Sequence, residues 1–168
     1  MIYRLPTIED EANLIEYVAE HQEHGENSIS ASLGLPVMDY QEWVAMVQKN
    51  ASIGSADWGK SLLYLCCDNG KIVGLLSIRY ELSENLSNQY GDIGYGVRPT
   101  ERRKGYAAKM LFHALEICKI KGMKKVILGC YQDNVASAAT IKSCGGVLIS
   151  ENDNYKKGRI SQYYLIHL

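Results

Sequence analysis

The stretch that most constrains this chain runs from residue 93 to 107 and reads IGYGVRPTERRKGYA. Its first five residues favour a strand, Pro99 marks a turn, three cations follow, and an amphipathic helix begins after Gly105. The first turn of a helix has backbone N–H groups without partners, and its dipole adds positive charge there. The stretch therefore predicts an anion site, suited to a pyrophosphate, at a strand-to-helix turn.

The side chains of this loop suit the same ligand. The three cations supply full charge, whereas Gly105 and Ala107 keep the loop low enough for a phosphate to approach the backbone. We expect the anion site to include every residue from 102 to 108: Arg102, Arg103, Lys104, Gly105, Tyr106, Ala107 and Ala108.

Length and composition predict one folded domain spanning residues 1–168. The chain has 168 residues, of which 46% are hydrophobic and 22% charged, which suits a single core and excludes a disordered protein. The net charge of −1 gives no support for a nucleic-acid partner.

The five cysteines are odd in number and include no Cys-x-x-Cys pair, so we expect reduced, mostly buried thiols and no metal site. The first residues do not resemble a signal peptide, and no apolar run has the length of a membrane span. These features predict a cytoplasmic protein without a membrane partner.

Hydrophobic periodicity predicts the order β-α-α-β-β-β-α-β-α-β-β. We expect strands near 1–5, 61–67, 71–80, 90–97, 125–130, 146–150 and 160–167, and helices near 7–24, 39–49, 106–121 and 134–143. Residues 25–38 and 50–60 are expected to be loops, and 81–89 a polar connection. The order predicts an α/β (α+β) fold with helices on both faces of a mixed sheet.

The loop also resembles a known motif. Arg102-x-x-Gly105-x-Ala107 is similar to the (Gln/Arg)-x-x-Gly-x-(Gly/Ala) coenzyme A loop of the GCN5-related N-acetyltransferase (GNAT) family. The element order resembles that family over nearly the whole chain, most closely from residue 72 to 148. The resemblance implies a mostly antiparallel sheet of about seven strands, acetyl-CoA as cosubstrate, and transfer of its acetyl group to a primary amine by direct attack in a ternary complex.

The resemblance also implies roles for residues on both sides of the loop. The pantetheine arm is expected against the strand backbone at Tyr95, Gly96 and Val97, where glycines alternate in the strand. Asn134 and Ser137 are expected to contact the arm from the next helix, although Asn134 is also a good N-cap.

The attacking amine must lose a proton during catalysis, so a general base is needed. Many related enzymes carry a carboxylate at the position of Asp92, and we therefore expect Asp92 to act as the general base. The Tyr that protonates the departing thiolate in many relatives is replaced by Ile141. Tyr131, Tyr164 and Tyr163 are the alternative acids, against the simpler reading that strand tyrosines pack in the core.

Two other functions stay open. Ile141 suits a catalytically weak relative that binds or senses acyl-CoA, and a structural protein without ligand is the third hypothesis. No Gly-x-Gly-x-x-Gly or Gly-Lys-(Ser/Thr) motif supports a dinucleotide or P-loop fold. The acceptor, a small-molecule or peptide amine, is expected to be set by loops 25–38, 50–60, 81–89 and 151–158. Relatives are often homodimers, which the resemblance extends to this chain as an expectation.

Overall fold

The computed structural model describes residues 1–56 and 58–168 of the chain. In that part, the strands are Ile2–Arg4 (β1), Ser61–Asp68 (β2), Lys71–Arg79 (β3), Ile93–Val97 (β4), Lys125–Tyr131 (β5), Val147–Asn152 (β6) and Ser161–His167 (β7). The α-helices are Glu11–Glu23 (α1), Tyr40–Ser52 (α2), Glu84–Tyr90 (α3), Tyr106–Ile120 (α4) and Val135–Ser143 (α5). Short 3₁₀ turns at Ile8–Asp10 and Pro99–Glu101 precede α1 and α4.

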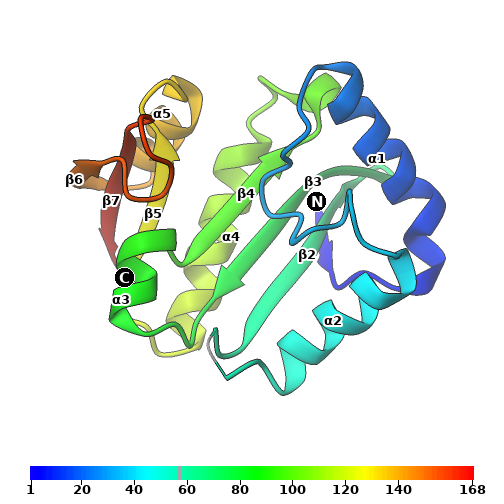
Figure 1. The fold of residues 1–168 in the computed structure, drawn as a ribbon, viewed down its shortest axis with the longest axis horizontal. Coiled ribbons are helices and arrows are strands. Elements are labelled where there is room, and N and C mark those ends of the chain that lie inside the picture. Colours follow the sequence, from blue (N-terminus) through cyan, green and yellow to red (C-terminus); the bar gives the residue numbers. More distant parts are fainter. Residues whose placement is uncertain (57) are drawn as a thin grey trace.

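The strands form two antiparallel sheets. One has the order β1-β2-β3-β4 and the other β5-β7-β6, and Figure 1 shows them side by side with β4 and β5 at the junction. The α/β class and the antiparallel character are confirmed, but a single continuous sheet was expected. The sheet divides because β4 and β5 meet only near their first residues, where the Asp92 N–H donates to the Ile127 carbonyl at 2.7 Å.

Helices cover both faces of the first sheet, as expected. On one face α4 buries an apolar stripe that includes Met110, Leu111 and Ala114, and α5 adds Ile141 to the same cluster. On the other face α1 and α2 pack Tyr17 and Trp43 against β2 and β3. Each large side chain buried in this way stabilises the fold by roughly 1.5–3 kcal/mol.

Helix α3 was not expected, because residues 81–89 were predicted to be an irregular polar connection. The Ser83 hydroxyl caps it by accepting the Leu86 N–H, and it ends at Gly91, whose φ of 74° favours glycine. None of its residues is buried. It therefore lacks the apolar periodicity by which helices are recognised in a sequence.

Two further expectations concern the state of the cysteines and the presence of a membrane-spanning helix. All five cysteines are free, with Cys66 and Cys118 buried and Cys67, Cys130 and Cys144 half-buried. Among the described residues, no helix combines the length and the apolar character needed to cross a membrane.

Candidate active site

The loop between β4 and α4 presents an open helix N-terminus. Arg103 and Gly105 both have positive φ, 63° and 79°, and α4 begins at Tyr106 without a side-chain cap. Within the described chain, no group accepts a hydrogen bond from the backbone amides of residues 103–108. A Cβ at Gly105 would meet no atom within 4 Å, so the space in front of these amides is open. The amides and the helix dipole are arranged for an anion.

The three cations of this loop have different surroundings. Arg102 forms a bidentate pair with Glu26, each N–O distance being 2.7 Å, and its Nε donates to the Val97 carbonyl at 3.2 Å. Lys104 pairs with Glu101 at 2.7 Å. Arg103 is exposed and pairs with no described carboxylate. Of the three, Arg103 is therefore the one whose charge is available to a ligand without breaking an ion pair.

Glu26 is held in place from its other side. The buried His21 ring shares a hydrogen bond of 2.8 Å with Glu26 through Nδ1, and burial lowers the pKa of His21. The hydrogen bonds from Arg102 and His21 outweigh desolvation and lower the pKa of Glu26 to about 2. Glu26 thus carries a full negative charge beside the β4–α4 loop, and no sequence pattern signalled it.

A second ionic network fixes α1 to the same loop. The buried Arg98 guanidinium bonds Glu16 at 2.9 Å and also Glu20. Glu20 in turn accepts the Thr100 N–H at 2.9 Å and the Thr100 hydroxyl at 2.8 Å. Burial raises the pKa of Glu20, but the bonds from Thr100 and Arg98 outweigh it and lower that pKa to about 2. These bonds attach the start of the loop, at Arg98 and Thr100, to α1.

Strand β4 has one open edge. The Arg98 N–H donates to Val73 and the Arg79 N–H to the Asp92 carbonyl, so the even-numbered residues of this strand pair with β3. In an antiparallel pair the intervening residues point their backbone groups the other way. Tyr95 and Val97 therefore direct their N–H groups to the gap between β4 and β5, where a ligand can pair with them.

Helix α5 closes the far side of this gap. Asn134 is its N-cap, and the Asn134 side chain accepts the Ser137 N–H at 3.1 Å. The Tyr95 hydroxyl lies 3.1 Å from the Ser137 hydroxyl, which links β4 directly to α5. The structure thus brings Tyr95, Asn134 and Ser137 to the gap that begins at the β4–α4 loop.

Asp92 lies at the closed end of the gap. It is 4% exposed, and its Oδ2 accepts the Ile127 N–H at 2.7 Å. Burial raises its pKa, against the lowering effect of that hydrogen bond. Its side chain lines a shallow hollow beside α3 together with Glu84 and Lys125. These contacts join the two sheets, and they leave the general-base role of Asp92 a prediction.

The expected acids lie in unlike environments. Tyr131 is half-buried at the end of β5, with the Arg159 guanidinium 3.5 Å from its ring centroid. Tyr164 is fully buried, and its hydroxyl donates to the Gln162 side chain at 2.8 Å. Tyr163 is also buried, with its hydroxyl donating to the Gln89 carbonyl at 2.9 Å. Of the three, Tyr131 is the one with an accessible surface, so a substrate can reach it.

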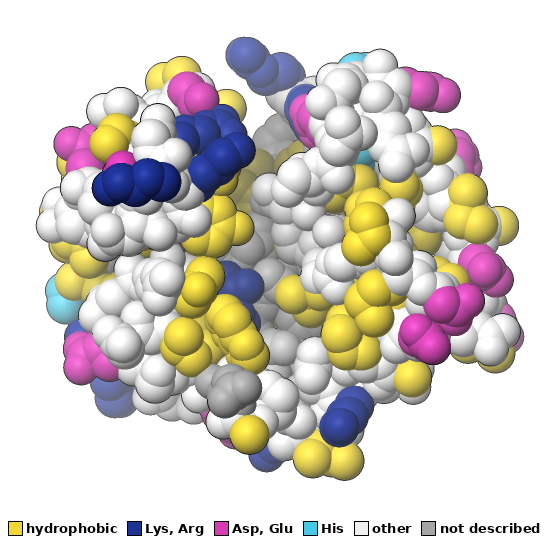
Figure 2. Space-filling model, viewed as in Figure 1, with side chains coloured by type: hydrophobic (Ala, Val, Ile, Leu, Met, Phe, Trp, Pro, Cys, Tyr) yellow, Lys and Arg dark blue, Asp and Glu magenta, His cyan; other side chains and the backbone are white. Residues whose placement is uncertain are grey.

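The structure adds aromatic residues that were not singled out as a group. Tyr155 lies between Tyr90 and Tyr131, with 6.0 Å between ring centroids in both directions. The ring of Trp58, which lies in one of the loops expected to set the acceptor, has its centroid 4.9 Å from that of Tyr90. Figure 2 shows a hollow between the two halves of the molecule with hydrophobic side chains, a class that includes Tyr and Trp in that view, along both sides.

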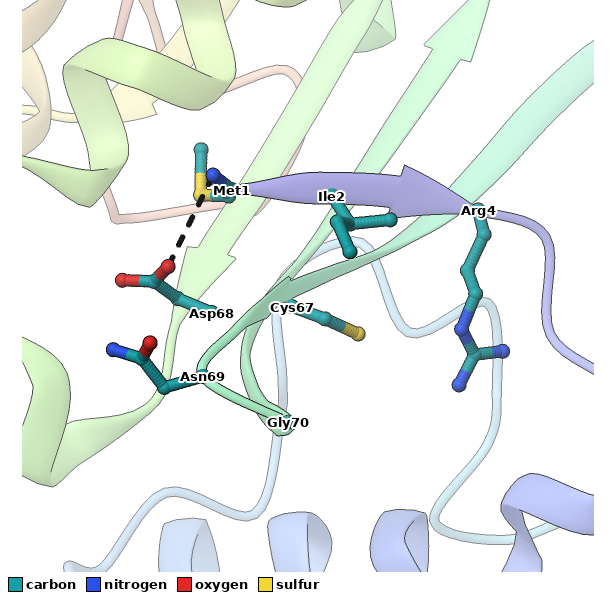
Figure 3. Close-up of a pocket in the computed structure, with 7 residues that line it drawn as sticks. All are labelled: Met1, Ile2, Arg4, Cys67, Asp68, Asn69 and Gly70. Carbon is teal, nitrogen blue, oxygen red and sulfur yellow. Dashed lines mark ion pairs between the residues drawn. The ribbon is translucent and has the colours of Figure 1, made fainter.

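The pocket in Figure 3 lies elsewhere, at β1 and the β2–β3 turn. Its acidic residue, Asp68, accepts a hydrogen bond of 2.6 Å from Tyr106 and lies 3.9 Å from the Met1 ammonium group. None of the residues expected at the active site lines it. The pocket is therefore a neighbour of the first turn of α4, and it lacks the open amides found at the loop.

Comparisons with known proteins agree with this geometry. The model of the acetyltransferase (GNAT) family matches residues 34–146, which is more than half of the chain. No curated protein matches the sequence.

Solved structures resemble the chain over its length. An acetyltransferase of the GNAT family from Streptococcus pneumoniae shares 18% identity, with a TM-score of 0.73 and 99% of each chain covered. A ribosomal-protein-alanine N-acetyltransferase from Brucella melitensis shares 17% identity, with a TM-score of 0.71 and all of both chains covered. The microcin C7 self-immunity acetyltransferase, solved with acetyl-CoA and AMP, shares 17% identity and a TM-score of 0.72, covering 99% of this chain and 91% of that one. At this identity the likeness shows the fold alone.

Proposed function

The chain belongs to the acetyltransferase (GNAT) family, and on that premise we propose that it transfers an acetyl group from acetyl-CoA to a primary amine. The observation that carries the proposal is the open N-terminus of α4 beside the open edge of β4. The N-terminus of α4 suits the pyrophosphate of acetyl-CoA, and the open edge of β4 suits the amide groups of its pantetheine arm.

In this proposal acetyl-CoA binds along the β4–α4 loop and the gap between β4 and β5. The amides of residues 103–108 and the free Arg103 side chain bind the pyrophosphate. The pantetheine amides pair with the edge of β4 at Tyr95 and Val97, and Asn134 and Ser137 face the arm from α5. The thioester then lies towards the beginning of β4, near the closed end of the gap. One neighbour of the same fold was solved with acetyl-CoA, which supports this donor.

The reaction proposed is a direct transfer. The amine nitrogen attacks the thioester carbonyl carbon, so that a C–N bond forms and the C–S bond breaks, and the thiolate leaves and takes up a proton. A backbone N–H on the open edge of β4 stabilises the negative oxygen of the tetrahedral intermediate. Holding both reactants in one cleft supplies a large part of the rate.

The proton carriers in this proposal follow from accessibility. Tyr131 is the tyrosine we retain as the acid for the thiolate, because Tyr164 and Tyr163 are buried with their hydroxyls engaged. Asp92 holds the closed end of the gap together by accepting the Ile127 N–H. In this proposal Asp92 also takes the proton of the attacking amine through a water, and a variant of Asp92 tests that role.

Gly105→Glu tests the donor site. It puts a negative charge where a Cβ now meets open space, and we expect acetyl-CoA binding and product formation to be lost, measured by calorimetry and thiol release. Gly122→Glu is the matched control, because Gly122 lies at the other end of α4 with a φ of 81° and no atom within 4 Å of its Cβ position. Normal turnover by the Gly105 variant would overturn the site assignment.

A second function, binding of acyl-CoA without efficient transfer, rests on one observation. Ile141 is 1% exposed and packs in the core, where many relatives place their acid. That function predicts a rise in melting temperature with acetyl-CoA but no thiol release with any amine. Ligand at 100 times its dissociation constant adds about 2.7 kcal/mol of stability, so binding is readily measured.

A further inference from the structure

Four aromatic rings from four separate segments form one continuous surface, which we call the aromatic rim: Trp58, Tyr90, Tyr131 and Tyr155. Ring centroids along it are separated by 4.9 Å from Trp58 to Tyr90, then 6.0 Å to Tyr155 and 6.0 Å to Tyr131. Trp58 is 39% and Tyr155 53% exposed. Large rings that pack together yet keep this much accessible surface can bind a further ring.

The rim begins with Tyr90 near the closed end of the gap and extends along β5 to Tyr131 at the other end of that strand. Tyr90 ends α3 and Tyr131 ends β5, and the segment that follows Tyr90 joins the two sheets through Asp92. The Arg79 guanidinium, behind the rim, donates to the carbonyls of Tyr90 at 3.3 Å and Gly91 at 2.9 Å. The Tyr90 end of the rim is thus near the beginning of β4, towards which the proposed donor directs its thioester, so an acceptor can enter along the rim.

The charges around the rim favour one chemical class of acceptor. The carboxylate of Asp133 is held by Arg159, with both oxygens 2.9 Å from Nη2. Asp153 is occupied by the Gly158 N–H and Lys157. Both carboxylates are engaged, so the described residues of the rim offer aromatic faces without a free carboxylate, whereas a polyamine or aminoglycoside needs several free carboxylates to match its cations.

We propose that the aromatic rim is the acceptor subsite and that it selects primary amines carrying an aromatic ring. The ring of the acceptor packs against Tyr155 and Trp58, and its amine extends into the gap towards the thioester. This inference rests on the proposed acetyl transfer and names the substrate class for it.

The test compares phenethylamine with 2-cyclohexylethylamine, which has the same size without aromaticity, and with spermidine. We expect kcat/KM to be highest for phenethylamine, by about 3- to 10-fold over the cyclohexyl compound, which is the range that aromatic pairing supplies. Tyr155→Ala is expected to lower kcat/KM for phenethylamine by about 10-fold, mainly through KM, and to leave ethylamine unaffected. Phe112→Ala, which removes a ring that is 65% exposed on α4, is the control and should change neither.

The outcomes separate the two proposals. Acetylation with a preference for spermidine, or equal losses for ethylamine and phenethylamine in Tyr155→Ala, would overturn the subsite and leave acetyl transfer intact. No turnover of any amine, with phenethylamine binding to wild type but not to Tyr155→Ala in calorimetry, would overturn the transfer proposal and support the subsite. Absence of both turnover and binding would overturn both.

Discussion

Glu26→Gln is the variant that most directly examines the phosphate loop. Arg102 is held by Glu26 through two contacts of 2.7 Å, so Arg102 must leave that carboxylate before it can contact a phosphate. Hydrogen bonds from Arg102 hold the pKa of Glu26 at about 2, so the carboxylate stays charged at any pH used for assays. Substitution is therefore the practical way to remove its charge.

The magnitude follows from the exposure of the pair. The Arg102 side chain is 42% and the Glu26 side chain 34% exposed, so solvent screens their attraction. Exposed ion pairs contribute about 0.2–1 kcal/mol, and the bidentate geometry puts this pair near the upper value. If acetyl-CoA draws Arg102 to a phosphate, Glu26→Gln should tighten binding by up to about 5-fold, which is the same free energy.

The stability of the free protein should change in the opposite direction. Loss of the pair should lower the melting temperature by about 2–4 °C for a domain of this size. Calorimetry with coenzyme A at low and high salt measures the change in affinity. The difference in affinity between wild type and Glu26→Gln should shrink at high salt, because salt screens the Arg102–Glu26 pair. Glu16→Gln is the matched control, because it removes a carboxylate of α1 that pairs with a different arginine, Arg98. Weaker binding by Glu26→Gln would refute the reasoning and show that Glu26 positions Arg102 for the ligand.

Three further variants have defined outcomes. Asn134→Ala removes the cap of α5 and should cost about 1 kcal/mol, measured as a lower melting temperature; an unchanged value would show that the cap is dispensable. Glu20 has a folded pKa of about 2, below its ordinary 4.5, so its contribution is complete above about pH 4.5 and is lost as pH falls towards 2. Glu20→Gln should therefore flatten the fall in melting temperature in that window, and an equal slope would contradict the network. Asp92→Asn keeps an oxygen that can accept from Ile127, so the protein should fold, but it should lose the acidic limb of its pH–rate profile if Asp92 is the base; a retained limb would refute that role.

Local features of the sequence predicted local structure well. The phosphate loop, the start of α4 and the Asn134 cap each depend on a few consecutive residues, so their chemistry can be read directly. The Glu26–Arg102 pair joins residues far apart in the chain and depends on how α1 packs, which no motif encodes. The aromatic rim of Trp58, Tyr90, Tyr131 and Tyr155 is likewise a product of tertiary structure.

The other differences between the sequence-based expectations and the structure arise because burial cannot be read from the sequence. Helix α3 was missed because a helix with no buried residue shows no apolar period. The environments of Asp92 and Tyr164 depend on depth, and a sequence does not reveal whether a polar side chain ends at the surface or inside. The point at which the two sheets are joined likewise depends on tertiary structure, because the Asp92 carboxylate accepts a backbone N–H from β5 there.

The junction at Asp92 and Ile127 is a point about which the two sheets can rotate relative to each other. Because the two sheets are joined there and diverge beyond it, the five residues of β4 act as a lever arm of about 17 Å. A rotation of about 5° at this junction would change the width of the open end of the gap by about 1.5 Å over that length. A small repacking at one end of the strand is thereby amplified at the other, where the phosphate loop lies.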